Sequence, residues 1–503
     1  MEIFHNIILG FQVASSWENL LFCFIGVVIG TLIGVLPGIG PTTGVAILIP
    51  ITFGMTATTA IITMCGVYYG AMYGGSTTSI LLNVPGESSS VVTTLDGYQM
   101  ARNGRPGPAL GMAALGSFIA GTFAVLMLTL IAPPLADFAV SFGPPEYFAL
   151  TFMGLTLVTS LGGESPLKGL ISGALGLLVA CVGIDAQSGV ARFTFDNMYL
   201  LDGVGFIGMA VGLFAASEVL VNIEAPMQQV FTEAKLSFLS LFPNLQDWKD
   251  SFGALWRGSV LGFVIGVLPG AGATIASFMA YALEKKLSKH PEKFGTGVIE
   301  GVAAPEGANN AAAGGAMVSL LTLGIPGSGT TAVMLGALMI HGLRPGPMLF
   351  STHPDFVWGL IASMYIGNVM LVILNMPLIG LWVRLLKVPY SVLMPLIITI
   401  SAVGVYATDN NVFDMWVLFF FGVVGYLMRK MEYPAAPMVL ALVLGPMVEM
   451  SLRQSLTISH GSPLIFFTRP ISAVLAVIAL LSLLAPLVKT LWTKYRQGRK
   501  NTV

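Results

Sequence analysis

Charged side chains are scarce in this sequence: Asp, Glu, Lys and Arg together make up 9% of its 503 residues. Soluble globular proteins carry about 25% charged residues, which cover the surface that faces water. This chain has too few charges to build such a surface, and hydrophobic residues make up 55% of it. The composition therefore excludes a soluble protein and predicts one that lies in a lipid bilayer.

Positive charge, cysteine and histidine are also in short supply. The net charge of −1 excludes the basic face that a nucleic-acid-binding protein needs. The three cysteines, Cys23, Cys65 and Cys181, lie far apart in apolar stretches and are expected to be free thiols. The five histidines are scattered, and no HExxH, CxxC or GxSxG pattern occurs. The sequence therefore predicts no metal site, no organic cofactor and no enzymatic activity.

Long apolar runs fill the chain. A bilayer core about 30 Å thick is crossed by about 20 helical residues. The runs that qualify are residues 20–35, 109–133, 147–161, 167–182, 206–221, 358–383, 388–405, 416–428 and 471–488. With shorter or broken segments added, we expect about ten to twelve membrane-embedded helices in an all-α polytopic fold.

The two ends of the chain give the expected orientation. Residues 1–12 lack the basic start of a removable signal peptide and are expected to form an interfacial helix. Basic residues follow the last apolar run directly, which places the C-terminus in the cytoplasm by the positive-inside rule. Lysines between 285 and 293 mark a second cytoplasmic loop.

An internal repeat is the most informative feature. Residues 26–40 read GVVIGTLIGVLPGIG, and residues 258–272 read GSVLGFVIGVLPGAG. In each block, four glycines at four-residue spacing make one smooth helix face that another backbone can approach closely. A similarity of this kind at a fixed distance in sequence indicates two homologous halves.

Further blocks follow in the same order. Gly74-Gly75 and residues 79–86 align with Gly314-Gly315 and residues 319–327, if a one-residue gap is allowed. The sequence predicts a first repeat at 1–225 with a hairpin near 72–101, a linker at 226–252, a second repeat at 253–430 with a hairpin near 309–341, and C-terminal helices with a basic tail at 431–503. Duplicated membrane halves are typical of secondary transporters, and we expect inverted topology.

Each repeat contains a Pro-Gly that is flanked by apolar segments of about a dozen residues and followed by Ser or Thr. Arms this short predict a re-entrant helical hairpin with its tip at membrane depth. A helix that begins there presents free N–H groups and a positive dipole end, which suit a carboxylate. For any single break, packing alone is the alternative, because Gly and Pro are common in membrane helices. The candidate substrate-binding residues are Asn83, Pro85, Gly86, Ser88, Ser89, Ser90, Pro326, Gly327, Ser328, Gly329, Thr330 and Thr331.

Broken helices also supply carbonyl and hydroxyl oxygens of the kind that bind a sodium ion. Acids inside a membrane are functional candidates because burying them is costly. Glu87, at the first tip, is either a coupling acid or an exposed hairpin residue. The asparagines that follow Glu306 in a polar, broken stretch serve either a site or structural hydrogen bonds. The candidate cation-binding residues are Gly38, Gly40, Thr42, Thr43, Gly270, Gly272, Thr274, Asn309 and Asn310.

Four blocks carry a resemblance to a known family: GVLPGIGPTTGVAILIP, YGGSTTSILLNVPGE, DGYQMARNGRPGPALG, and EGVAAPEGANNAAAGG with IPGSGTTAVMLGAL. Over essentially its whole length, the chain resembles the large membrane subunit of the bacterial tripartite tricarboxylate transporters. The resemblance implies a secondary transporter in the bacterial inner membrane that imports citrate or another di- or tricarboxylate, coupled to sodium or protons. It also implies two partners, a small membrane subunit and a periplasmic solute-binding protein that delivers the substrate.

Two other functions compete with this expectation. An anion channel also uses helix N-termini, but a duplicated hairpin pair favours alternating access over a fixed pore. An exporter of small organic acids uses the same architecture in the opposite direction.

Overall fold

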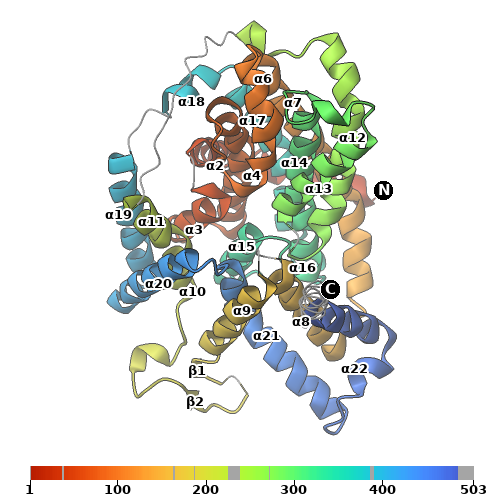
Figure 1. Cartoon of the computed structure of the whole chain (residues 1–503). Coiled ribbons are helices and arrows are strands. Elements are labelled where there is room, and N and C mark those ends of the chain that lie inside the picture. The colour runs from red at the N-terminus through yellow and green to blue at the C-terminus, as the bar shows by residue number, and fades with distance from the viewer. Residues whose placement is uncertain are drawn as a thin grey trace, which may run out of the picture.

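The computed structural model describes residues 2–36, 39–161, 165–185, 187–224, 238–270, 272–385 and 390–484. In these residues the regular structure is helical, apart from one short antiparallel pair in which β1 (Gly183–Ile184) faces β2 (Ala191–Arg192) (Figure 1). Six helices are long and apolar enough to cross a membrane, and six shorter apolar helices accompany them. The prediction of an all-α polytopic membrane protein is confirmed.

The first half of the chain contains α1 to α11. Their bounds are α1 (Glu2–Ala14), α2 (Trp17–Val35), α3 (Gly40–Thr52), α4 (Ala57–Leu82), α5 (Val91–Thr93), α6 (Gln99–Arg102), α7 (Pro106–Ala139), α8 (Pro144–Leu161), α9 (Pro166–Ala180), α10 (Phe206–Val211) and α11 (Ser217–Glu224). A 3₁₀ turn at Ser88–Ser90 precedes α5, and π-helical turns at Thr94–Tyr98 and Gly212–Ala216 join α5 to α6 and α10 to α11.

The second half contains α12 to α22. Their bounds are α12 (Leu245–Val267), α13 (Gly272–Leu287), α14 (Glu300–Leu323), α15 (Gly329–Ile340), α16 (Leu349–Thr352), α17 (Pro354–Asn375), α18 (Ile379–Leu385), α19 (Tyr390–Asp409), α20 (Val412–Lys430), α21 (Ala436–Ile458) and α22 (Ile465–Thr468). A last apolar helix covers Pro470–Leu484. Short 3₁₀ turns lie at Met198–Leu200, Phe238–Leu241 and Pro291–Lys293.

The glycine faces bring two helix pairs to backbone contact. A Cβ added to Gly30 of α2 would lie 2.5 Å from the carbonyl oxygen of Val67 in α4. A Cβ on Gly262 of α12 would lie 2.3 Å from the carbonyl oxygen of Ala308 in α14. Lipid gives helices no hydrophobic reason to associate, so close packing of small residues holds such pairs together. The approach predicted from the glycine spacing is confirmed.

The same contacts correct the predicted alignment of the repeats. Gly74 approaches the carbonyl oxygen of Thr31, and Gly315 approaches that of Phe263, each with an added Cβ at 2.4 Å. Gly74 therefore corresponds to Gly315, not to Gly314, and no gap is needed. The sequence alignment was wrong by one residue because consecutive glycines and small residues fit more than one register.

The first arms of the hairpins are also longer than predicted. α4 has 26 residues and α14 has 24, so neither is a half-helix. Residues 59–81 and 301–322 are all buried, which frees these helices from presenting apolar side chains to lipid. Hydropathy therefore understates their length, since their sequences are rich in Gly, Ala, Ser and Thr.

After each long helix the chain turns back alongside it. α4 ends at Asn83 with φ 58°, and α14 ends at Gly324 with φ 70°, both in the left-handed conformation that closes helices. The return brings the Gly86 N–H to 3.4 Å from the Gly75 carbonyl oxygen, roughly two turns back along α4. Gly327 packs against Ala316 of α14 in the same way. The short helix that follows each Pro-Gly thus begins beside the middle of a buried helix.

Contacts between the two halves are reciprocal. α7 of the first half packs on α14, and α17 of the second half packs on α4. Likewise, the turn at Ser88–Ser90 packs on α13, and α15 packs on α3. A two-fold axis produces paired contacts of this kind. They support the predicted repeat, while its inverted topology stays a prediction.

The predicted linker differs from the structure at its C-terminal end. α12 begins at Leu245, inside the stretch assigned to the linker, because Asn244 and Asp247 form a capping box that starts a helix among charged residues. Residue 225, residues 226–237 of that linker and the basic tail after residue 484 lie outside the described residues.

Asp96, in the first π-helical turn, ties the first hairpin to the second half of the chain. Its buried carboxylate accepts hydrogen bonds from the N–H groups of Gly295 (2.9 Å), Gly297 (2.8 Å) and Val298 (3.0 Å). The hydroxyl of Tyr281 donates a fourth, at 2.8 Å. The loop between α13 and α14 is thereby fixed to the hairpin of the other repeat.

Gly262→Ala tests the backbone contact between α12 and α14. The added methyl meets a carbonyl oxygen that cannot rotate away, so we expect the free energy of unfolding to fall by about 1–3 kcal/mol. The measurement is thermal unfolding of the purified protein in detergent. Gly54→Ala is the control, because a Cβ at Gly54 meets no atom within 4 Å. Equal stability of the two variants would contradict the close approach.

Candidate functional site

Each short helix begins with a reciprocal cap. At the second tip, the Ser328 hydroxyl accepts from the Thr331 N–H at 3.3 Å, and the Thr331 hydroxyl accepts from the Ser328 N–H at 2.9 Å. At the first tip, the Glu87 carboxylate accepts from the Ser89 N–H at 3.1 Å, and the Ser90 hydroxyl accepts from the Glu87 N–H at 3.4 Å. Such boxes fix the direction in which the remaining N–H groups of the first turn point.

The two tips meet around the starts of α3 and α13. The hydroxyl oxygens of Ser88 and Thr274 lie 2.9 Å apart, and so do those of Thr42 and Thr330. A Cβ added to Gly272, at the start of α13, would lie 3.9 Å from the Cβ of Ser328. Residues predicted from two distant parts of the sequence are therefore brought together, and each hydroxyl pair joins one repeat to the other.

The caps differ in charge. Glu87 places a carboxylate at the N-terminus of the first short helix, where it offsets the positive end of the helix dipole. The corresponding cap in the second hairpin is Ser328, which is neutral. The second tip therefore keeps its attraction for an anion and is the better candidate for binding a carboxylate. Ser328 and Gly329 are half-buried there, whereas Pro326 and Gly327 are buried.

Two hydroxyls of the first tip are engaged inside the protein. Ser89 is buried and contacts both Glu87 and the side-chain oxygen of Asn309, the latter at 2.7 Å. Ser90 is buried and donates to the Glu87 carbonyl oxygen at 2.9 Å. Among the three serines of this tip, Ser88 alone is exposed.

The remaining first-tip residues have backbone roles. Exposed Asn83 ends α4 through its left-handed backbone, at the far end of the return segment that contains half-buried Pro85. A Cβ on Gly86 would lie 2.0 Å from the carbonyl oxygen of Gly34, which leaves no space for any side chain.

The predicted cation residues fall into separate groups. Gly40, Gly270 and Gly272 have positive φ angles of 66°, 80° and 64° at the starts of α3 and α13, near the tips. Thr43 is buried and donates to the Phe214 carbonyl oxygen at 3.5 Å. Gly38 lies outside the described residues. Both asparagines lie on α14. Asn309 bonds to Glu87 and Ser89 of the first tip, whereas Asn310 belongs to a separate buried polar network.

This network is centred on Glu306, which is fully buried. The hydroxyl of Ser76 donates to its carboxylate at 2.7 Å, that of Ser117 at 3.4 Å, and Thr93 donates to its other oxygen. The stretch around Glu306 was expected to be broken, but α14 runs through it continuously despite Pro305. Sequence reasoning missed the three hydroxyl partners because they lie on α4, α5 and α7, about two hundred residues away.

A cavity of about 580 Å³ lies beside the second hairpin. α9, α10, α15 and α21 contribute to its wall, including Gly336 and Met339 of α15 but none of the tip residues. The β1–β2 segment borders it, and Asp185 in that segment pairs with Arg453 of α21 at 2.9 Å. The N–H of Gln187, the Ser188 hydroxyl and Arg453 hold the pKa of Asp185 well below its usual range. The segment is thus anchored by an ionised carboxylate.

Comparison with known proteins adds a family. Residues 20–440 match the sequence model of the tripartite tricarboxylate transporter TctA family. An uncharacterized 52.8 kDa protein of the TAR-I ttuC' 3' region of Agrobacterium vitis is 47% identical over 494 residues, which cover 98% of both chains. An uncharacterized protein of the TAR-II ttuC' 3' region of the same organism is 45% identical over 236 residues, 47% of this chain and 98% of its own. No solved structure matches the chain.

Cysteine cross-linking tests whether the tips meet. In a background with Cys23, Cys65 and Cys181 replaced by alanine, we expect Ser88→Cys with Thr274→Cys to form a disulfide on mild oxidation. Thr42→Cys with Thr330→Cys should do the same, because each pair of hydroxyls lies 2.9 Å apart. The measurement is the loss of both maleimide-reactive thiols. The four single variants, which keep their thiol, are the controls, and two unreacted thiols in both double variants would place the tips apart.

Proposed function

The chain belongs to the tripartite tricarboxylate transporter TctA family, and on that premise we propose that it is the large membrane subunit of a secondary transporter that imports a di- or tricarboxylate. In this proposal it lies in the bacterial inner membrane with its C-terminus in the cytoplasm. A small membrane subunit accompanies it, and a periplasmic solute-binding protein delivers the substrate. Import is coupled to a cation gradient, with sodium as the coupling ion.

The observation that carries the proposal is the start of α15 among hydroxyls at the repeat interface. No Lys or Arg occurs in residues 83–90 or 324–331, so the tips themselves offer a carboxylate N–H groups and hydroxyls. The N-terminus of a helix supplies both oriented N–H donors and a favourable dipole. Thr330 and Thr42 now satisfy each other, and either hydroxyl can turn to donate to a carboxylate.

The hydroxyl pairs also suit a moving interface. Each neutral hydrogen bond contributes about 1 kcal/mol to the contact that it makes. The two hydroxyl pairs that join the tips to the opposite repeat can therefore be replaced by hydrogen bonds to substrate with little loss of free energy. Replacement of a contact between repeats by a contact to substrate is what alternating access requires of a binding site at a repeat interface.

The charges favour cation coupling. Glu87 and Glu306 are both buried near the interface, and neither forms an ion pair among the described residues. A substrate with two or three negative charges would add to this local excess. Cations that bind together with the substrate would offset the repulsion between the substrate and these two acids. This supports symport over transport of the anion alone.

Uptake by the reconstituted complex tests the function. With the small membrane subunit in the vesicle and the binding protein outside, we expect saturable accumulation of a radiolabelled carboxylate that an inward sodium gradient drives. A panel of mono-, di- and tricarboxylates identifies the substrate. Uptake driven by a proton gradient alone would contradict the proposal that sodium is the coupling ion. Uptake that needs ATP, or flux that equilibrates without accumulation, would reject secondary transport.

Four variants test the role of the tips. Gly86→Leu and Gly327→Leu should abolish uptake, because a Cβ at either residue already meets backbone atoms within 3.0 Å. Thr330→Val should raise the apparent KM about five-fold, the equivalent of one lost hydrogen bond. Ser88→Ala should raise it less, since the first tip carries the Glu87 cap.

The measurement is uptake at matched expression, with Ser459→Ala as the control outside both hairpins. Wild-type kinetics in both glycine variants would place the substrate elsewhere. A larger effect of Ser88→Ala than of Thr330→Val would reverse the assignment of the tips.

A further inference from the structure

Glu306 is an acid whose charge nothing in the described residues balances. It lies in the second turn of α14 with an exposed fraction of 0%, and none of the ion pairs formed by described residues includes it. A carboxylate buried without a cation is strongly destabilising. A residue of this kind within a membrane bundle either binds a positive ion or holds a proton.

The hydrogen bonds around Glu306 fit the ionised form. Ser76, Thr93 and Ser117 all donate hydroxyl protons to the carboxylate. The Asn310 amide donates to the Ser117 oxygen at 2.7 Å, which leaves the Ser117 proton free to point at Glu306. An ionised carboxylate only accepts, whereas a protonated one needs an acceptor for its own proton. Three hydroxyls that can donate are thus gathered on this carboxylate, an arrangement that can hold it in its charged form.

A second oxygen beside it also lacks a partner. Asn310 is fully buried, and its side-chain carbonyl oxygen accepts no hydrogen bond. Its amide group bonds to Ser117 and to the Glu306 carbonyl oxygen at 3.1 Å, so its position is fixed within the network. An unsatisfied buried carbonyl is costly unless a donor or a cation approaches it.

We propose that Glu306 and Asn310 form the core of a sodium site between the two repeats, with Ser76, Thr93 and Ser117 as hydroxyl ligands or supports. The surrounding groups offer oxygen only, which suits a hard cation. No group of three or more His, Cys, Asp or Glu in the described part of the chain offers a site for a transition metal. This site rests on the proposed function in its role as the coupling site, although ion binding itself does not require transport.

Glu87 is the weaker candidate for the same ion. Its carboxylate accepts from the Ser89 N–H at 3.1 Å, at the positive end of a helical turn, and from the Asn309 amide at 3.1 Å. Its charge is therefore partly balanced by a helix terminus. Glu306 lies in the second turn of α14, beyond the free N–H groups at the start of the helix, so the macrodipole offsets its charge less.

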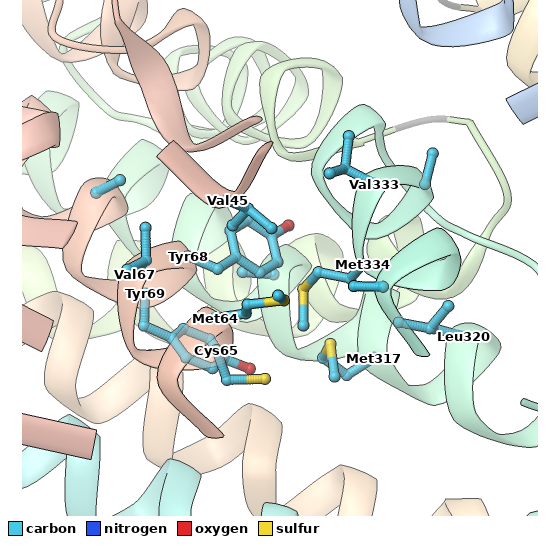
Figure 2. Packing of buried hydrophobic residues seen from close by; sticks show 14 of the residues in the cluster. Val45, Met64, Cys65, Val67, Tyr68, Tyr69, Met317, Leu320, Val333 and Met334 are labelled. Carbon is cyan, nitrogen blue, oxygen red and sulfur yellow. The ribbon is translucent and has the colours of Figure 1, made fainter. Parts of the chain in front are cut away.

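The corresponding residues of the other repeat show that the helix packing does not require Glu306, Asn310 and their hydroxyl partners. In the corrected register, Glu306 and Asn310 correspond to Cys65 and Tyr69, while Ser76 and Thr93 correspond to Met317 and Met334. Figure 2 shows these four hydrophobic residues gathered in one buried cluster. The same helix packing thus uses Cys, Tyr and Met side chains at one place and a carboxylate, an amide and hydroxyls at the other.

The ligands come from both repeats. Glu306 and Asn310 lie on α14, while the hydroxyls belong to α4, α5 and α7 of the first repeat. Thr93 lies only three residues after Ser90, in the helix that begins at the first tip. Occupancy of the site therefore holds that helix against α14, which couples the ion to the geometry of the tips.

Sodium-dependent stabilisation of the purified full chain is the test. A ligand that binds only the folded protein raises its unfolding temperature in proportion to the logarithm of its concentration above Kd. We expect NaCl, compared with choline chloride at equal ionic strength, to raise the unfolding temperature of the wild type by several degrees. Glu306→Gln should abolish the rise, and bound ²²Na⁺ should fall by one ion per chain. Glu300→Gln, on the first turn of the same helix, is the matched control and should respond as the wild type does.

Two further variants test the sodium site if Glu306→Gln does not fold. Thr93→Val and Ser117→Ala should each weaken the apparent sodium affinity several-fold. An unchanged sodium response in every foldable variant would overturn the proposal. A wild type that responds to pH but not to sodium would also overturn it, because the carboxyl would then hold a proton. Sodium-dependent stabilisation is measured without carboxylate uptake. Its result therefore does not depend on whether the proposed transport function is correct.

Discussion

Backbone contact between α2 and α4, and between α12 and α14, is the constraint on which the other features depend. Each return segment lies against both members of its pair: Gly86 touches the Gly34 carbonyl oxygen and Gly75, and Gly327 touches Gly266 and Ala316. A wider pair would leave the Pro-Gly segments without a surface to lie on. The glycine spacing thus places the start of each short helix beside the middle of a buried helix, where buried surroundings permit irregular backbone.

Full burial also explains the composition of the central helices. α4 and α14 are shielded from lipid by the helices around them, so polar side chains are tolerated where they find partners. The consequence is a protein interior that holds acids, amides and hydroxyls as well as apolar side chains. Glu306 and Asn310 can exist there because α4, α5 and α7 bring hydroxyls to them.

Local patterns predicted much of this architecture. Glycines at four-residue spacing indicated the helix contacts, and Pro-Gly followed by Ser or Thr indicated two short helices at corresponding places. The sequence did not reveal the length of α4 and α14. Hydropathy detects helices whose apolar side chains face lipid, and these two helices are buried within the protein. It also missed the partners of Glu306, since hydrogen bonds across about two hundred residues leave no periodic signal. The register of the repeats was misread at Gly74, where neighbouring small residues are interchangeable to an alignment but not to a packed backbone.

The hydrogen bonds of Asp96 bear on which parts of the molecule form mechanical units. They fix the first hairpin to the loop between α13 and α14, while Ser88 joins its tip to α13. In the corrected register, Asp96 corresponds to Ala337 in the second hairpin, which has no carboxylate with which to make such bonds. Any displacement of α13 and α14 therefore carries the first hairpin with it. The boundary between rigid bodies in this protein does not follow the boundary between its duplicated halves.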